Sequence, residues 1–217
     1  MINSKPKNSF FKFCSMLEVY NLDFDYPDKT VLRTIQFSVP AGSLLHLRGE
    51  NGSGKSTLLK LLAGLLYPDQ GQILYHEKDI HADRATYQQH ICYVGHKPGI
   101  SLGLTVAENC RFDLYYPSST NKSIEALIAN FGLQGMENKL CGLLSAGQRR
   151  RVGLIKLLFS RKALWLLDEP FVSLDQSAIF LLTDCLIQHL NQGGAIIMTS
   201  HQAIPLSGIP HQEYTLQ

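Results

Sequence analysis

A glycine-rich loop at residues 49–57 is the feature that most constrains the fold of this chain. It reads Gly-Glu-Asn-Gly-Ser-Gly-Lys-Ser-Thr and fills every position of the phosphate-loop pattern G-x-x-x-x-G-K-[ST]. Glycines let backbone N–H groups approach phosphate oxygens, and the helix that follows points the positive end of its dipole at the same anion. An apolar run at residues 44–48 predicts a strand before the loop, and residues 55–66 predict the helix after it. A glycine-rich turn with an incidental lysine is the weaker alternative, so the sequence predicts a nucleotide-binding α/β domain.

The pattern also predicts what individual side chains of the loop do. Lys55 would bridge the β- and γ-phosphates, the Ser56 hydroxyl would ligate Mg²⁺, and Thr57 would lie near the α- and β-phosphates. The residues of the loop predicted to contact the nucleotide are Gly49, Glu50, Asn51, Gly52, Ser53, Gly54, Lys55, Ser56 and Thr57.

Composition narrows the class of protein further. The chain has 217 residues, enough for one domain with a substantial core, and its net charge of +2 gives no electrostatic reason to expect nucleic acid or an anionic membrane surface. The five cysteines lack any C-x-x-C spacing and predict reduced, packed thiols rather than metal ligands. No apolar run approaches the ~18 residues of a membrane span, so we expect a cytoplasmic chain that meets a membrane only through partners.

The chain divides into three parts in sequence. Residues 1–15 carry no motif and little periodicity and are expected to be a disordered N-terminal extension. Residues 16–217 are expected to form a single domain, in which short apolar runs alternate with helical patterns and predict a mainly parallel sheet flanked by helices. Within this domain, residues 105–138 are helical in character, which predicts an inserted helical lobe at about residues 97–143.

Acidic residues follow the predicted strand at residues 163–167. Asp168 would lie at the carboxyl edge of the sheet beside the phosphate loop, where it can hold Mg²⁺ through water. Glu169, just before Pro170, is the candidate for polarising the attacking water. A solvated strand end is the alternative for two adjacent acids.

Further segments follow the phosphate loop in a fixed order. They are Leu144-Ser145-Ala146-Gly147-Gln148, Leu166-Leu167-Asp168-Glu169-Pro170, Ser173-Leu174-Asp175 and a lone His201 after an apolar strand. With the phosphate loop, this ordered set resembles the ATP-binding cassette (ABC) ATPases over about residues 17–201. The resemblance implies a P-loop NTPase (RecA-like) core with a parallel sheet, an N-terminal antiparallel β region and an inserted small helical subdomain. It also implies hydrolysis of ATP to ADP and phosphate, with ATP and Mg²⁺ as cofactors.

The resemblance implies that two copies of the chain share each nucleotide. Ser145 opens a helix with the capping-box pattern S-x-x-Q, which by itself is only a good helix start. In the family, this helix start, with Gly147 and Gln148, faces the ATP of a second subunit; Ala146 stands where Gly is commonest. Asp175 matches a loop that communicates across the dimer, and it can equally be a helix N-cap. His201 stands where the family has an imidazole on the γ-phosphate.

Three other features are open to two interpretations. Tyr26 matches the aromatic residue that the family often stacks on adenine, or it is a turn tyrosine beside Pro27. His96 stands where the family usually has a glutamine that contacts Mg²⁺ and water; an imidazole can also accept from water, but its geometry and pH response must differ. The basic run at residues 149–151 could indicate nucleic acid, but after a helix cap a solvated helix face near bound phosphate is favoured.

The stretch Gly95-His96-Lys97-Pro98-Gly99-Ile100 narrows the resemblance to the CcmA-type ATPases of cytochrome c maturation. It implies an ATP-hydrolysing subunit at the cytoplasmic face of the inner membrane, bound to permease subunits, as a homodimer and without nucleic acid. Such a protein couples hydrolysis to haem handling and to release of a haem-loaded chaperone. The alternatives are an ATPase of another small importer or exporter and, less favoured, a soluble ABC ATPase of DNA repair or translation.

Overall fold

Two β-sheets organise the molecule. A computed structural model describes residues 15–114, 123–200 and 211–217. The antiparallel sheet has the strand order β2-β1-β4-β5 and the parallel sheet the order β6-β7-β8-β3-β9. The strands are β1 Ser15–Tyr26, β2 Lys29–Pro40, β3 Leu44–Arg48, β4 Gln70–Tyr75, β5 Lys78–Asp79, β6 Ile91–Val94, β7 Leu164–Leu167, β8 Ala195–Thr199 and β9 His211–Thr215.

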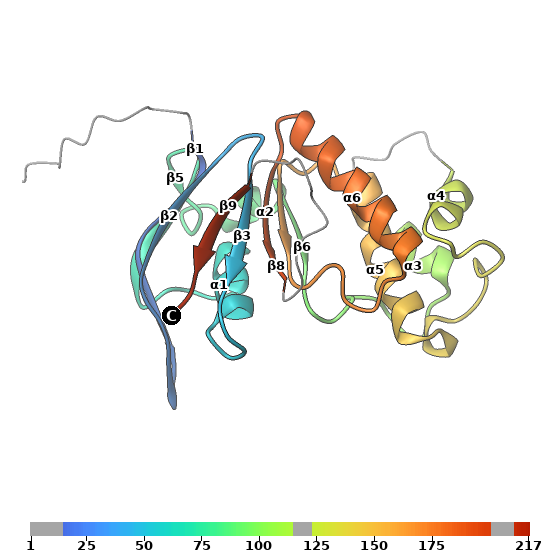
Figure 1. The fold of residues 1–217 in the computed structure, drawn as a ribbon, viewed down its shortest axis with the longest axis horizontal. Coiled ribbons are helices and arrows are strands. Elements are labelled where there is room, and N and C mark those ends of the chain that lie inside the picture. The colour runs from blue at the N-terminus through green and yellow to red at the C-terminus, as the bar shows by residue number, and fades with distance from the viewer. Residues whose placement is uncertain (1–14, 115–122, 201–210) are drawn as a thin grey trace, which may run out of the picture.

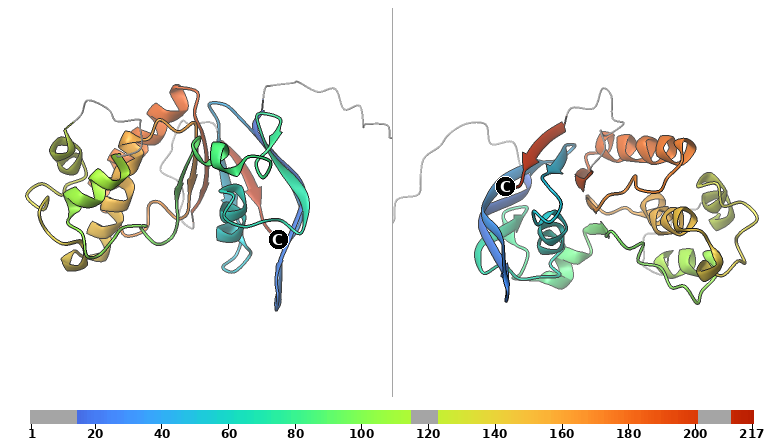
Figure 2. Two further views of the ribbon diagram at one scale, coloured as in Figure 1. Left: turned by 180° about the vertical axis from the view of Figure 1, so that it is seen from behind. Right: turned by 60° about the horizontal axis from the view of Figure 1, so that its bottom comes forward.

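Helices fill the space between the sheets and cover the far face of the parallel sheet. They are α1 Lys55–Leu62, α2 Arg84–Gln88, α3 Val106–Leu114, α4 Ile124–Asn130, the 3₁₀ turn η1 Cys141–Leu143, α5 Ala146–Phe159 and α6 Gln176–Asn191. Helix α1 lies between the antiparallel and parallel sheets, and α5 and α6 lie on the opposite side of the parallel sheet (Figures 1 and 2). Helices α3 and α4 pack against α5 and lie farthest from the antiparallel sheet (Figure 1).

Both faces of the parallel sheet are buried, because successive apolar side chains of its strands point to opposite faces. In β7, Leu164 and Leu166 belong to a core shared with α1 and the antiparallel sheet, while Trp165 and Leu167 belong to a core shared with α3 to α6. Successive side chains of a strand point to opposite faces, so a fully apolar strand of this kind fits only a sheet covered on both sides. The parallel sheet is therefore the middle layer, with α1 and the antiparallel sheet on one side and α3 to α6 on the other.

The strand register brings the candidate site residues to one edge of the sheet. Val94 pairs with Leu167, Leu167 with Met198, and Leu47 with Thr199, so the carboxyl ends of four parallel strands are level. The residues that follow these strands meet at this edge, where open α/β sheets bind ligands.

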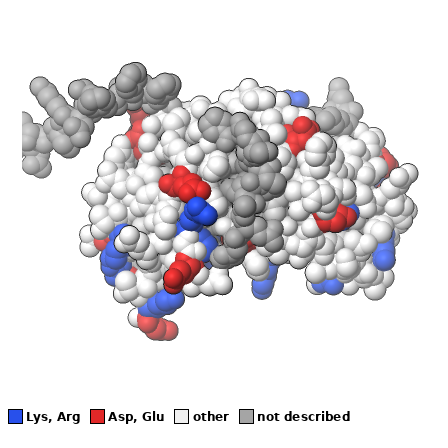
Figure 3. All heavy atoms as spheres, viewed as in Figure 1, with Lys and Arg blue, Asp and Glu red and all other residues white. Residues whose placement is uncertain are grey.

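The predicted fold class is confirmed, with differences at the element ends. Helix α1 ends at Leu62 rather than near residue 66, because Gly64 adopts a positive φ of 65° that stops the helix. Ser15 already belongs to β1, whereas residues 1–14 of the expected extension lie outside the described residues. None of the helices in the described ranges has the length and apolar character that a membrane crossing requires. Acidic and basic side chains are interspersed on the face shown in Figure 3.

Candidate nucleotide-binding site

The glycine-rich loop connects β3 to α1 with backbone angles that glycine permits. Gly49, Gly52 and Gly54 have φ values of 145°, 86° and 94°, and Gly54 is the N-cap of α1. A Cβ atom at Gly54 would come within 2.8 Å of Cγ1 of Val31, so β2 packs directly on this turn. Only glycine adopts such angles at no steric cost, and the turn leaves the first N–H groups of α1 pointing out of the helix end.

Lys55 closes the loop on itself. Its Nζ donates hydrogen bonds of 2.8 Å to the carbonyl oxygens of both Gly49 and Glu50, and the residue is 8% exposed. The hydroxyl of Ser53 is also buried and makes no hydrogen bond within the described part of the chain. The loop therefore holds a lysine ammonium at the position where the pattern predicts phosphate oxygens.

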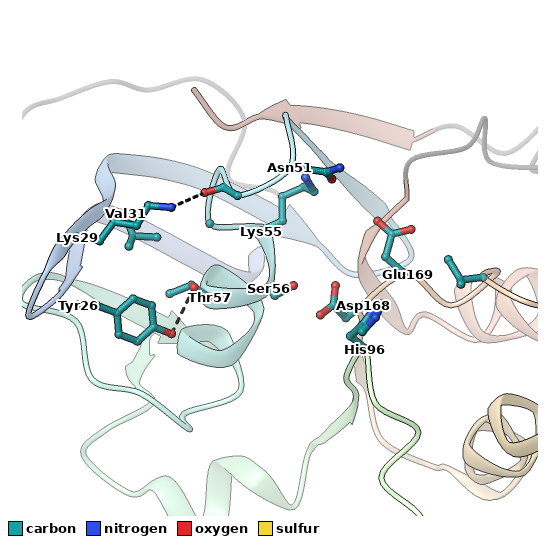
Figure 4. Close-up of a pocket in the computed structure, with 13 residues that line it drawn as sticks. Tyr26, Lys29, Val31, Asn51, Lys55, Ser56, Thr57, His96, Asp168 and Glu169 are labelled. Atoms are coloured by element: carbon teal, nitrogen blue, oxygen red, sulfur yellow. Dashed lines mark hydrogen bonds between the residues drawn. The ribbon is translucent and has the colours of Figure 1, made fainter. Parts of the chain in front are cut away.

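A cavity of about 390 Å³ opens in front of this loop (Figure 4). It is lined by Tyr26, Lys29, Val31, Asn51, Gly52, Gly54, Lys55, Ser56, Thr57, His96, Asp168, Glu169 and Val172. Lysines and the amino end of α1 lie on one side of the cavity, and the acidic pair and His96 lie on the other (Figure 4). The structure thus brings six of the nine predicted loop residues together with the ends of β6 and β7, whereas Gly49, Glu50 and Ser53 do not line the cavity.

The acidic pair is held by the neighbouring strand β8. The hydroxyl of Thr199 donates to Oδ1 of Asp168 at 2.9 Å and accepts the backbone N–H of Glu169 at 2.9 Å. Asp168 is 3% and Glu169 is 9% exposed, so both carboxyl groups lie at the buried end of the cavity rather than at a solvated strand end. Thr199 was not among the predicted site residues; its only signal in the sequence is a polar residue closing an apolar strand.

Arg150 of α5 joins the ends of β6 and β7. Its Nη1 donates to the carbonyls of Gly95 and His96 at 2.8 and 3.2 Å, and its Nη2 donates to those of Asp168 and Glu169 at 2.7 and 2.8 Å. The residue is 5% exposed, and burial lowers the pKa of its guanidinium. The prediction of a solvated helix face is therefore wrong for this residue. A sequence run of three arginines cannot show which of them turns inward.

Tyr26 and His96 lie on opposite sides of the cavity. The hydroxyl of Tyr26 is 3.5 Å from Oγ1 of Thr57, and its ring makes an edge contact with Phe24. Tyr26 is 39% exposed and lines the cavity. His96 is exposed and lines the same cavity as Asp168.

The start of α5 lies outside this cavity. Ser145 and Gln148 form the predicted capping box, with reciprocal hydrogen bonds of 3.2 and 3.0 Å to each other's backbone. Ser145, Gly147 and Gln148 are not among the residues that line the cavity of their own chain. Gly147 packs on the chain ahead of α6, since a Cβ there would lie 2.6 Å from the carbonyl oxygen of Ser173.

Asp175 occupies the N-cap of α6. Its Oδ1 accepts the N–H of Ala178 at 3.0 Å, and its Oδ2 lies 2.6 Å from Nη2 of Arg151. The backbone hydrogen bond from Ala178, followed by those from Ser177 and Arg151, lowers the pKa of this carboxyl group. The N-cap interpretation therefore holds in the structure. The other predicted residue, His201, lies outside the described residues.

The fold and the cavity define a P-loop nucleoside triphosphatase. A family described as ABC transporter matches residues 32–172. The protein named cytochrome c biogenesis ATP-binding export protein CcmA of Legionella pneumophila (strain Lens) is 47% identical over 201 residues, which cover 93% of this chain and 100% of that relative. The protein of the same name from Escherichia coli (strain K12) is 41% identical over 189 residues, covering 87% and 90%. The chain belongs to the ABC transporter ATPases and, within them, to the CcmA group.

Solved structures agree with this assignment. An ATP-binding subunit of an ABC transporter is 28% identical and superposes with a TM-score of 0.78, covering 86% of this chain and 80% of the other. A putative ABC transporter ATP-binding protein from Pyrococcus furiosus is 25% identical with a TM-score of 0.76, covering 92% and 96%. Members of this family bind and hydrolyse ATP, and this chain is an ATPase of that type.

Proposed function

We propose that this chain is the ATP-hydrolysing subunit of a membrane ABC complex for cytochrome c maturation. The observation that carries the proposal is the 47% identity over the full length of a CcmA relative, in a chain whose phosphate loop and acidic pair line one cavity. As an ATP-binding subunit of an export system, it works with membrane partners. We take these to be permease subunits of the cytochrome c maturation type, which hold the chain at the cytoplasmic face of the inner membrane.

ATP would bind with its phosphates against the loop and its adenine beside Tyr26. The ammonium of Lys55 would exchange its two carbonyl partners for the β- and γ-phosphates, which offer a stronger charge-assisted hydrogen bond. The backbone N–H groups at the start of α1 and the Ser53 hydroxyl supply further donors. The ring of Tyr26, which lines the cavity, would stack on the base, and its hydroxyl lies 3.5 Å from Oγ1 of Thr57.

The donors at the floor of the cavity fit Mg²⁺. The Ser56 hydroxyl and the Asp168 carboxylate supply oxygen atoms, which this ion prefers, and His96 faces the same space. Within the described residues, no cluster of three or more His, Cys, Asp or Glu side chains forms a metal site. Two protein oxygens and the nucleotide's own phosphates match the way Mg²⁺ is held in phosphoryl-transfer sites. When bound, the ion would neutralise charge on the phosphates.

Hydrolysis requires a water aligned with the γ-phosphate. Glu169 is the base in this proposal, since its side chain lines the cavity and Thr199 fixes its backbone. His201 would contact the γ-phosphate from the end of β8. The Ser145 start of α5, with Gly147 and Gln148, would complete the site of a second copy, because these residues do not line the cavity of their own chain.

ATP hydrolysis would drive haem handling by the membrane complex and the release of a haem-loaded chaperone. A Lys55→Ala chain should fold and reach its partners but hydrolyse ATP about 10²–10³-fold more slowly, because it lacks a cation at the developing charge. Cells carrying only this variant should lack haem-stained c-type cytochromes, keep cytochromes with non-covalent haem, and accumulate haem covalently attached to the chaperone.

Lys60→Ala is the matched control. Lys60 lies on the same helix but does not line the cavity, so its loss should leave c-type cytochromes at parental levels. If Lys55→Ala cells keep normal c-type cytochromes and instead lose uptake or efflux of another compound, the ATPase assignment stands and the cytochrome assignment is wrong.

A further inference from the structure

Three residues of α5 contact the end of β6 and the loop that follows it. Arg150, Gly153 and Lys156 recur every three residues and so share one side of the helix. Nζ of Lys156 donates to the carbonyl of Tyr93 at 2.8 Å, and Arg150 binds the carbonyls of Gly95 and His96. A Cβ at Gly153 would lie 2.5 Å from the carbonyl oxygen of Pro98, so the helix touches the loop backbone directly.

The guanidinium of Arg150 also contacts the residues that follow β7. Its second nitrogen binds the carbonyls of Asp168 and Glu169, which places one planar fork between two strand ends. The two ends carry His96 and Glu169, both of which line the nucleotide cavity. A lysine could not reproduce this contact, because its ammonium is a point donor without the rigid fork of arginine.

Glu169 needs such support because of its backbone. Its φ of +51° lies in the left-handed region, which non-glycine residues rarely adopt. Conformations of this kind persist where the surroundings fix them from several sides. Here Thr199 binds the N–H of Glu169 and Arg150 binds its carbonyl, so the peptide units on both sides of the residue are held.

We propose that Arg150 is a positioning residue for ATP hydrolysis, which sets Glu169 and His96 against the bound nucleotide from the α5 helix. This inference rests on the proposed site of ATP hydrolysis and goes beyond it, since Arg150 does not line the cavity. Because Ser145 begins the same helix, the arginine links the surface that meets a second copy to the base of its own site. Ser145 and Arg150 are separated by about one and a half turns of α5.

The first test separates hydrolysis from binding. Arg150→Lys and Arg150→Met are compared with the parent and with Arg161→Gln, an exposed arginine just beyond α5 that serves as control. Both Arg150 variants should lower kcat at least about tenfold at saturating ATP, as expected for a misplaced reacting group. The Kd of ATP measured without Mg²⁺ should change less than about threefold, because the phosphate loop is untouched. Arg161→Gln should match the parent in both.

The second test asks whether Arg150 acts through Glu169. In a Glu169→Gln chain, single-turnover hydrolysis should fall less than about threefold when Arg150→Lys is added, since residues that act as a unit are not additive. An equal loss in both backgrounds would overturn the proposal. So would a folded Arg150→Met chain with parental kcat, or a loss of kcat matched by the loss of ATP affinity.

Folding is checked by thermal melts of each variant, with kinetics measured well below the lowest Tm. If Arg150→Met does not fold, Arg150→Lys decides alone; if neither folds, Arg150 serves folding and the proposal fails. A parent chain without any ATPase activity would instead contradict the ATPase assignment and is recognised before any variant is compared.

Discussion

At the scale of single residues, the site separates groups that meet the nucleotide from groups that hold them. Lys55 and Glu169 line the cavity. Thr199 and Arg150 do not line it, and they bind the backbone N–H and the carbonyl of Glu169. Glu169 is constrained in its main chain, yet its side chain still faces the cavity. This division is what preorganised catalysis requires, because the reacting group is held before the substrate arrives.

The contribution of Tyr26 can be measured against a neighbour of equal exposure. Tyr26→Ala should raise the Kd of ATP about tenfold, since stacking on a base contributes roughly 1–3 kcal/mol. Tyr26→Phe keeps the ring and loses only a contact of 3.5 Å to Thr57, so its Kd should stay near the parental value. Tyr20 lies on the same strand and is 38% exposed, and Tyr20→Ala is the control. Titration with a fluorescent ATP analogue measures all three, and equal Kd values would return Tyr26 to the role of a turn tyrosine.

The residues that could be predicted are those whose signal is local. The phosphate loop, Asp168 and Glu169 each follow an apolar strand, and their types and spacing indicate their chemistry directly. Arg150 and Thr199 could not be found this way, because their partners lie 18 and 31 residues away along the chain. Their roles arise only when the strands align.

At the scale of elements, α5 combines three structural features. Its first turn is the capped surface that begins at Ser145, its middle holds Arg150 and Gly153, and its apolar side packs against α3, α4 and α6. Its start could be predicted from the capping box, and the bounds of β3 from an apolar run. Strand β9 could not, since His211-Gln-Glu-Tyr-Thr215 is mostly polar and becomes a strand by pairing with β3. The five-residue helix α2 is likewise too short for a periodic signal.

The two small residues at the start of α5 should respond differently to substitution. Gly147→Ala would place a Cβ 2.6 Å from the carbonyl oxygen of Ser173, so we expect a loss of about 1–3 kcal/mol of stability together with ATPase activity. Ala146 is exposed, and Ala146→Gly, which restores the family's commonest residue, should cost at most about 1 kcal/mol. Urea unfolding and ATPase rates of both chains measure this. Equal stability of the two variants would mean that the contact with Ser173 can relax.

The packing of α6 on the parallel sheet should depend on pH. His189 stacks on Trp165 with ring centroids 3.9 Å apart, and burial lowers the pKa of this imidazole. The folded chain therefore binds the His189 proton less readily than the unfolded chain, so the free energy of unfolding should fall as the pH drops below about 6.5.

His189→Phe keeps a ring against Trp165 and removes the proton, so it should flatten this part of the pH profile. Burial also lowers the pKa of His46, so some dependence remains in the variant. Urea unfolding from pH 7.5 to 5.5 compares the two chains. A variant as pH-sensitive as the parent would show that His189 is not the group that titrates.

At the scale of the whole molecule, a separate hydrophobic core lies on each side of the parallel sheet. The core around α1 and the antiparallel sheet supports the phosphate loop and Tyr26, and the core around α3 to α6 supports Ser145. The parallel sheet between them carries Asp168 and Glu169 at its edge. One chain therefore contains a cavity and a capped helix start that does not line it. The proposed head-to-tail pair of chains would bring each helix start to the other's cavity.

This arrangement predicts the behaviour of a trapped enzyme. Glu169→Gln should keep the ATP affinity of the parent, lose turnover by about 10²–10⁴-fold as a chain without its base, and accumulate as an ATP-bound dimer. Size-exclusion chromatography with and without ATP measures the shift. Adding Ser145→Arg to this chain should abolish the dimer but leave ATP binding intact, because Ser145 does not line its own cavity.

Mixing two inactive chains supplies the decisive control. Lys55→Ala and Ser145→Arg chains should each hydrolyse little ATP, but a heterodimer contains one site with an intact phosphate loop from one chain and an intact Ser145 from the other. Each mixed dimer has one working site of two, so the rate should rise well above that of either chain alone, to at most about half of the parental value. A mixture as inactive as its components, or a monomeric chain that hydrolyses ATP at the parental rate, would show that Ser145 does not act across a pair of chains.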